Sequence, residues 1–187
     1  MSVETSMRDR ILDAAELRMR SVGYNAVSFR ELADDVNIKS ASIHYHFPAK
    51  EDLGVQLVER YKERFEERLN AIDKSDLHSS IATFLKLYAD ALTVGETMCL
   101  CAVLGAESNG LPTGVRDCVG SFFQLNSAWL ADLNERHGLD EIVPSPTEII
   151  SGLEGAMIVS TSRTDRRFLD ELITRIRSAY AAASPKA

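Results

Sequence analysis

Apolar residues recur every three or four positions along most of the chain, the spacing that places them on one face of an α-helix. Ile11, Ala15 and Met19 follow this pattern near the start, and Leu169 and Ile173 follow it near the end. No segment combines sustained alternation of β-branched residues with hairpin turn signals, which would indicate strands. The sequence therefore predicts an all-α protein with about nine helices. They are expected at about residues 6–23, 28–35, 39–46, 50–69, 76–93, 97–108 and 113–137, with two more that begin near 146 and 164.

Local signals mark several helix boundaries. Ser28 and Glu31 have the spacing of a capping box, in which the serine hydroxyl and the glutamate carboxylate satisfy backbone N–H groups at a helix start. Ser145 and Glu148 repeat this pattern. Pro48 ends the helix before it, because proline disfavours helical geometry at the preceding residue. These three boundaries are thus predicted from side-chain chemistry as well as from periodicity.

Composition restricts the class of protein. Apolar residues make up 45% of the chain, which supports a packed core and argues against disorder. The sequence has no apolar run of about 18 residues and no basic N-terminal region followed by an apolar stretch, so neither a membrane span nor a secretory signal is expected. The three cysteines are an odd number, which argues against a disulfide framework and favours a reducing cytoplasm.

Charge is distributed unevenly along the chain. The net charge is −7, yet residues 1–50 hold seven Lys and Arg and seven Asp and Glu, so the excess of acid lies in the remainder. Residues 36–50 carry two lysines, two histidines and no acid. Nucleic-acid phosphates would tolerate this stretch and be repelled by the rest. We expect one domain at residues 1–49 and a second at residues 50–187.

Two short helices joined by a turn at residues 36–38 form a helix-turn-helix. An ordinary hairpin of helices in an all-helical core is the alternative. The side-chain types favour DNA binding, because phosphates need donors and base edges are read by short polar or aromatic side chains in the major groove. Ile38, Ile43 and Phe47 are expected to point inward. The outward candidates include no carboxylate and are Lys39, Ser40, Ser42, His44, Tyr45 and His46.

These same residues carry a family resemblance. The run from Ser28 to Ala33, followed by the run from Ile38 to Leu53 with its Tyr-His-Phe and Lys-Glu-Asp-Leu sequences, resembles the signature of the tetracycline-repressor family. The resemblance implies an N-terminal three-helix helix-turn-helix domain, followed by a helical ligand-sensing and dimerisation domain. It also implies a cytoplasmic homodimeric repressor that binds a palindromic double-stranded DNA operator and is released by a small-molecule or electrophile inducer.

The resemblance also implies roles for single residues in DNA binding. Arg30 matches a position that reaches the major groove, and Lys50 matches a phosphate-binding lysine. Tyr45 and His46 match phosphate contacts, with a core position and a helix C-terminal cap as their respective alternatives. His44 departs from the tyrosine of many members, which leaves base preference there open. The expected DNA-binding set is Ser28, Arg30, Lys39, Ser40, Ala41, Ser42, His44, Tyr45, His46 and Lys50.

The last two helices are expected to form a dimer interface. In the family that the sequence resembles, two such helices from each subunit form a four-helix bundle. Dimerisation also has a physical reason, because two recognition helices about 34–36 Å apart read a palindromic site. A helix pair within one chain is the alternative. The expected interface residues are Ile149, Gly152, Leu153, Ala156, Met157, Leu169, Leu172, Ile173, Ile176 and Tyr180.

Residues 98–107 suggest how a signal is received. This segment is similar to a subgroup that includes regulators of electrophile and N-ethylmaleimide detoxification, in which a cysteine at the position of Cys99 senses electrophiles. Cys99 is expected at a helix N-terminus, where the dipole favours the reactive thiolate, and Cys101 is a second candidate. The alternative is that both thiols only pack in the core. Two positions apart, they face different sides of a helix, so no metal site is expected.

A non-covalent ligand in a pocket among the middle helices is the other candidate signal. Its expected lining is Tyr88, Met98, Phe122, Phe123 and Trp129, although residues of these types are more often plain core. An enzyme is disfavoured, because the sequence holds neither a phosphate-binding glycine loop nor an HExxH motif, and no cofactor is expected. A helical protein-interaction module without DNA binding is the alternative function.

Overall fold

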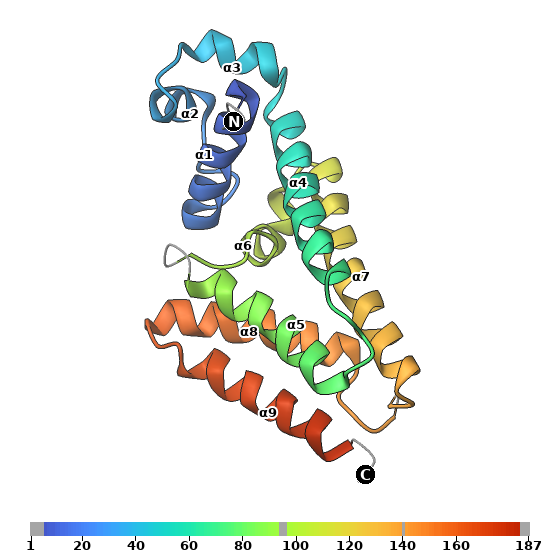
Figure 1. Cartoon of the computed structure of the whole chain (residues 1–187). Coiled ribbons are helices and arrows are strands. Elements are labelled where there is room, and N and C mark those ends of the chain that lie inside the picture. The colour runs from blue at the N-terminus through green and yellow to red at the C-terminus, as the bar shows by residue number, and fades with distance from the viewer. Residues whose placement is uncertain (1–5, 94–96, 140, 184–187) are drawn as a thin grey trace, which may run out of the picture. The chain divides into compact units, whose positions relative to one another are not determined.

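The structure, a computed structural model, describes residues 6–93, 97–139 and 141–183. Within these ranges it contains nine α-helices, one short 3-10 helix and no strand, which confirms the predicted all-α fold (Figure 1). Nor does any helix in these ranges have the length and apolarity that a membrane crossing requires. The helices are α1 (Met7–Val22), α2 (Phe29–Asp35), α3 (Ser40–His46), α4 (Lys50–Asn70), α5 (Leu77–Thr93), α6 (Leu100–Ala106), η2 (Ser108–Gly110), α7 (Thr113–Arg136), α8 (Pro146–Arg163) and α9 (Arg167–Ala183).

Two helices differ from their predicted extents. Helix α6 is shorter than the predicted 97–108, and α9 begins at Arg167 rather than near 164. The later start of α9 has a local cause. Thr164 adopts the left-handed conformation, with φ 50°, and ends α8. The Asp165 carboxylate then accepts a hydrogen bond from the Arg167 N–H at 3.0 Å, so the new helix begins there.

The chain divides into two compact units, of which the first comprises residues 1–63 and 100–120. In this unit α1 packs against α2 and α6, and α2 packs against α3. Ile11 of α1, Leu32 of α2 and Ile43 of α3 are all fully buried in its core. The domain boundary at residue 49 stays a prediction.

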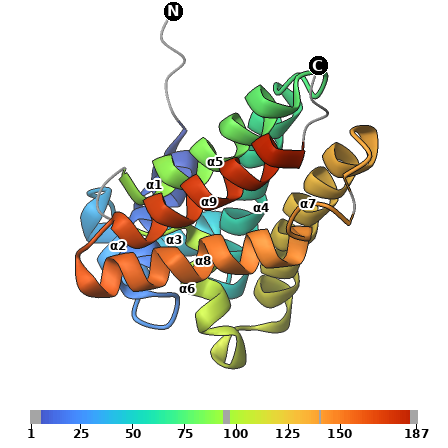
Figure 2. The same cartoon turned by 90° about the horizontal axis from the view of Figure 1, so that it is seen from below.

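The second unit comprises residues 64–99 and 121–187. Helices α8 and α9 form an antiparallel pair, and α9 also packs against α5 (Figure 2). The Phe84 and Trp129 rings stack with centroids 5.1 Å apart, and the Trp129 indole N–H donates to the Leu69 carbonyl at 3.3 Å. The partly polar tryptophan is therefore satisfied inside an aromatic core.

Candidate nucleic-acid interface

Helix α2 begins at the predicted capping box, which the structure confirms. The Ser28 hydroxyl accepts a hydrogen bond from the Glu31 N–H at 3.3 Å, and the Glu31 carboxylate accepts one from the Ser28 N–H at 2.9 Å. The Ser28 hydroxyl also donates to that carboxylate at 2.7 Å. These bonds lower the pKa of Glu31. Ser28, expected to contact DNA, thus uses its side chain to start α2.

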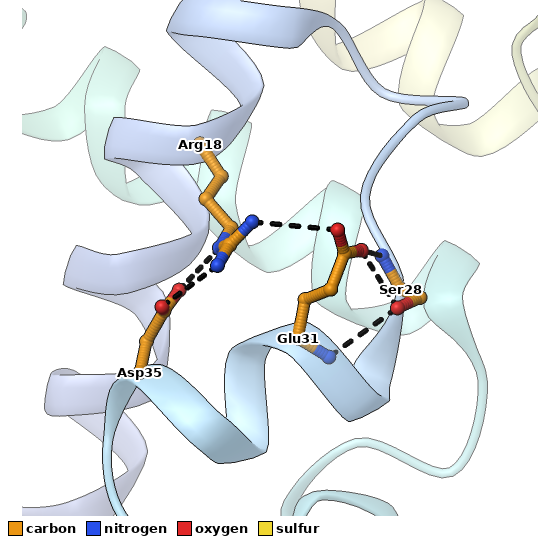
Figure 3. Close-up of polar contacts among 4 residues, drawn as sticks. All are labelled: Arg18, Ser28, Glu31 and Asp35. Atoms are coloured by element: carbon orange, nitrogen blue, oxygen red, sulfur yellow. Dashed lines mark hydrogen bonds and ion pairs between the residues drawn. The ribbon is translucent and has the colours of Figure 1, made fainter.

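Arg18 of α1 joins both ends of α2 (Figure 3). Its guanidinium contacts Glu31 in the first turn at 3.5 Å and forms a two-pronged pair with Asp35 in the last turn, where one N···O distance is 2.8 Å. Hydrogen bonding to Arg18 lowers the pKa of Asp35. A carboxylate at a helix C-terminus is unfavourable, and the arginine compensates it. The ion pairs therefore fix the orientation of α2 on α1.

The turn between α2 and α3 is a Schellman motif centred on Asn37. This residue adopts the left-handed conformation with φ 56°. The Asn37 N–H bonds to the Asp34 carbonyl at 3.2 Å, and the Ile38 N–H bonds to the Ala33 carbonyl at 2.9 Å, which is the bond pattern of the motif. The sequence predicted a turn at residues 36–38, and these two hydrogen bonds show how the turn is formed.

Helix α3 has a buried side and an exposed side. Ile43 and Phe47 are fully buried, as predicted, whereas Ile38 is only half-buried. Tyr45 is 85% exposed, which rules out the alternative of a core tyrosine. Of the other expected DNA contacts, Arg30, Lys39, Ala41 and His44 are exposed, and Ser40, Ser42 and His46 are half-buried.

The aromatic side chains on this surface contact one another and their neighbours. The His44 ring meets Phe29 edge-on at 4.8 Å, and its Nδ1 lies 3.4 Å from the Pro48 carbonyl oxygen. The Tyr45 and His46 rings meet edge-on at 5.2 Å. His44 is thus oriented by its contacts with Phe29 and Pro48, while the ring of Tyr45 extends into solvent.

Lys50 departs from the expected position of a phosphate ligand. Its ammonium donates to the Asn25 carbonyl at 3.3 Å and lies 4.5 Å from the centroid of the Tyr24 ring. Burial lowers the pKa of Lys50. In this structure the lysine therefore holds the loop between α1 and α2.

The two candidate sensor cysteines lie at the start of α6. Cys99 directly precedes the helix, as predicted, and both Cys99 and Cys101 are buried. The neighbour of Cys99 that the sequence did not reveal is Glu154 of α8, a buried carboxyl group. Burial above all, and then Cys99, raise the pKa of Glu154 well above its usual value. No signal in the apolar stripe of α8 distinguishes Glu154 from a surface glutamate.

The described residues form neither a disulfide nor a cluster that could bind a metal ion. None of the three cysteines is in a disulfide. Across residues 6–93, 97–139 and 141–183, no group of three or more histidine, cysteine or acidic side chains could hold a metal ion.

The five expected pocket residues belong largely to the core of the second unit. Tyr88, Phe122 and Trp129 are buried, and Met98 and Phe123 are half-buried. None of the five lines the groove of about 470 Å³ between α5 and α9. The groove is lined by Ser79, Ala82, Thr83, Leu85, Lys86, Ala89, Asp170, Ile173, Thr174 and Arg177.

Most of the expected dimer residues pack inside the chain itself. Gly152, Ala156 and Leu172 are half-buried. The other seven expected residues are buried in this single chain. They are Ile149, Leu153, Met157, Leu169, Ile173, Ile176 and Tyr180. The large apolar side chains that α8 and α9 do expose are Ile158, Val159 and Phe168.

Comparison with known proteins places this chain beside bacterial regulators. Residues 11–57 match the family model described as bacterial regulatory proteins, tetR family. A curated relative is the biofilm operon icaADBC HTH-type negative transcriptional regulator IcaR of Staphylococcus aureus, which is 38% identical over 52 residues. The match covers 28% of this chain and 28% of that relative, so it concerns only about a quarter of either protein.

Solved structures resemble nearly the whole chain. A TetR transcriptional regulator from Legionella pneumophila has a TM-score of 0.85 and 29% identity, covering 95% of this chain and 98% of its own. The reduced form of E. coli NemR has a TM-score of 0.79 and 18% identity, covering 92% and 96% respectively. At that identity the second likeness concerns the fold alone.

Proposed function

We propose that this chain is a DNA-binding transcriptional regulator of the tetR family of bacterial regulatory proteins, whose helix α3 enters the major groove of a double-stranded operator. The observation that carries the proposal is the outward surface of α3. It presents lysine, histidine and tyrosine side chains, and the helix contains no carboxylate. Such donors suit phosphate oxygens and base edges, whereas acidic side chains would be repelled.

The proposed contacts fall into two classes. Arg30 and the start of the recognition helix, from Ser40 to Ser42, would reach base edges in the groove. Lys39, Tyr45 and His46 would contact phosphates. Lys50 joins this second class only if its ammonium leaves the Asn25 carbonyl when DNA binds.

We further propose that the regulator acts as a homodimer through α8 and α9. A single seven-residue recognition helix buries little surface, and two of them read a palindromic site. The apolar surface available for this purpose on these helices includes Ile158, Val159 and Phe168. As a regulator of bacterial DNA, the dimer would act in the cytoplasm.

A small molecule or an electrophile would release the dimer from its operator. Cys99 is the candidate electrophile target, although its thiol is buried and must become accessible to react. The signal must bind the released and DNA-bound states with different affinity, and α4 would transmit the change to the recognition helices. For Cys99→Ser we expect intact operator binding and loss of the response to N-ethylmaleimide. An unchanged response would leave the non-covalent ligand as the signal.

Fluorescence anisotropy with the DNA upstream of the protein's own gene tests the proposed function. We expect specific binding that weakens steeply with salt, because phosphate contacts release counterions. Lys39→Ala should weaken binding and reduce the salt slope by about one. Lys86→Ala is the matched control, since Lys86 is an exposed lysine of α5 paired with Asp90. Absence of binding even at low salt would refute the proposal and favour a protein-interaction module.

A further inference from the structure

The loop between α1 and α2 is held by a side chain from a distant part of the sequence. Glu107 directly follows α6, and its carboxylate accepts a hydrogen bond from the Tyr24 N–H at 2.9 Å. The backbone of Glu107 is itself fixed, because its N–H bonds to the Leu104 carbonyl at 3.0 Å and its carbonyl accepts from the Gly110 N–H at 2.7 Å. The backbone from which the carboxylate extends is therefore fixed.

Gly23 gives independent support for this close approach. Its φ is +83°, which side chains rarely adopt, and a Cβ added there would lie 1.8 Å from Glu107 Oε1. The backbone conformation thus favours glycine, and a Cβ there would displace the carboxylate beside it. The Glu107 side chain occupies the space that any larger residue at position 23 would need.

Tyr24 connects this contact to the rest of the unit. Its ring is buried and packs so closely on α4 that a Cβ at Gly54 would lie 2.9 Å from it. The Lys50 ammonium covers the same ring and is attracted by the Glu107 carboxylate. The Tyr24 ring thus fixes the loop against α4, and the Tyr24 N–H fixes it to the Glu107 carboxylate. Helix α2 begins only five residues after Tyr24.

We infer that Glu107 is a positioning residue for DNA binding: by holding the Tyr24 N–H it fixes the loop from which α2 and α3 extend. The inference rests on the proposed function. It also gives α6 a role, because this helix begins one residue after Cys99 and ends one residue before Glu107. Seven residues of helix span about 10 Å, so α6 connects the position of Cys99 to that of Glu107.

Three variants of the full chain test the inference. Glu107→Ala removes the acceptor, Glu107→Gln keeps a carbonyl oxygen at the same length, and Glu135→Ala is the control at an exposed glutamate of α7. We expect Glu107→Ala to lower affinity for the upstream DNA about tenfold, the equivalent of one hydrogen bond to a charged acceptor. Glu107→Gln should retain most of the affinity, and Glu135→Ala all of it.

Amide hydrogen exchange supplies a readout without DNA. The Tyr24 amide should exchange at least about tenfold faster in Glu107→Ala than in the control, while the amides within α1 keep their protection. Unchanged exchange at Tyr24 would overturn the inference. So would faster exchange combined with operator affinity equal to that of Glu135→Ala, because the contact would then be structural only. If the unaltered protein binds no DNA, the proposed function fails and takes the inference with it.

Gly23→Ala gives a second route to the same contact. This change should weaken operator binding through both backbone strain and the clash with Glu107. In the Glu107→Ala background the clash is gone, so the additional loss caused by Gly23→Ala should be smaller. Strictly additive effects would show that the two residues do not act on each other, and would overturn the inference.

Discussion

Asn37 is the residue on which the turn of the helix-turn-helix depends. It adopts the left-handed conformation, with φ 56°, in a position where many helices end on glycine. Asparagine tolerates this conformation better than other residues with a Cβ, because its short polar side chain can bond locally. The turn therefore forms without glycine, although at some conformational cost.

Substitutions at Asn37 should show whether the stability of the turn depends on the left-handed backbone conformation of this residue. We expect Asn37→Val to lower the free energy of unfolding by about 1–2 kcal/mol, because a β-branched residue is strained in the left-handed region. Asn37→Gly should be neutral or slightly stabilising. Urea denaturation followed by circular dichroism measures both. Equal stability of the two variants would contradict the conformational explanation.

Glu154 should make stability depend on pH. Because burial raises its pKa in the folded state, the group keeps its proton while the unfolded chain has already lost it. The stability that it contributes is complete below the ordinary glutamate pKa and is lost as the pH rises toward the folded value. The slope reaches about 1.4 kcal/mol per pH unit between the two values.

The comparison with Glu154→Gln isolates this dependence. The glutamine variant cannot ionise, so its stability relative to the unaltered protein should increase as the pH rises from about 4.5. Unfolding free energies measured in urea at a series of pH values give the difference directly. A difference that stays constant with pH would show that Glu154 ionises as easily in the folded chain as in the unfolded one.

At the scale of elements, the orientation of α2 depends on α1 through Arg18. The pair with Asp35 is only partly exposed, with one third of each side chain accessible. A double-mutant cycle of Arg18→Ala and Asp35→Asn should give a coupling of about 0.5–1 kcal/mol in the free energy of unfolding. The same cycle applied to Lys86 and Asp90, an exposed pair within α5, is the control and should give less. Equal couplings would mean that Arg18 does not hold α2.

The helices could be predicted from sequence because their signals are local. Periodicity and capping residues identified every helix, and only α6 and the start of α9 differed appreciably. The partner of each apolar stripe could not be predicted in this way. Tyr180 and Leu153 were expected at a dimer interface, yet they are buried inside one chain. An apolar stripe has the same pattern whether its own chain or a second chain covers it.

The candidate site could be predicted only in part, because the sequence shows its local features and not its long-range contacts. Side-chain types on α3 follow directly from the sequence, and Phe47 and Ile43 are buried as expected. Long-range contacts are not visible in sequence spacing. Lys50 lies on Tyr24 instead of extending outward, and Glu107 reaches a loop 83 residues earlier in the chain.

At the scale of the whole molecule, assembly should depend on the apolar side chains that α8 and α9 leave exposed. We expect Val159→Arg and Phe168→Arg to convert the proposed dimer into a monomer, because each would bury an unpaired charge. Leu17→Arg is the matched control, as Leu17 is an exposed leucine of α1. Light scattering coupled to size exclusion gives the mass. An unaltered dimer mass in both α8 and α9 variants would place the interface on another surface.

The Glu107–Tyr24 contact can contribute no more to DNA binding than the strength of one hydrogen bond. One hydrogen bond to a charged acceptor contributes about 1.5–3 kcal/mol, which corresponds to a factor of about ten to a hundred in affinity. A signal cannot change an equilibrium by more than the interaction it alters. A wider dynamic range would require a second link, and the packing of α1 against α6 offers one.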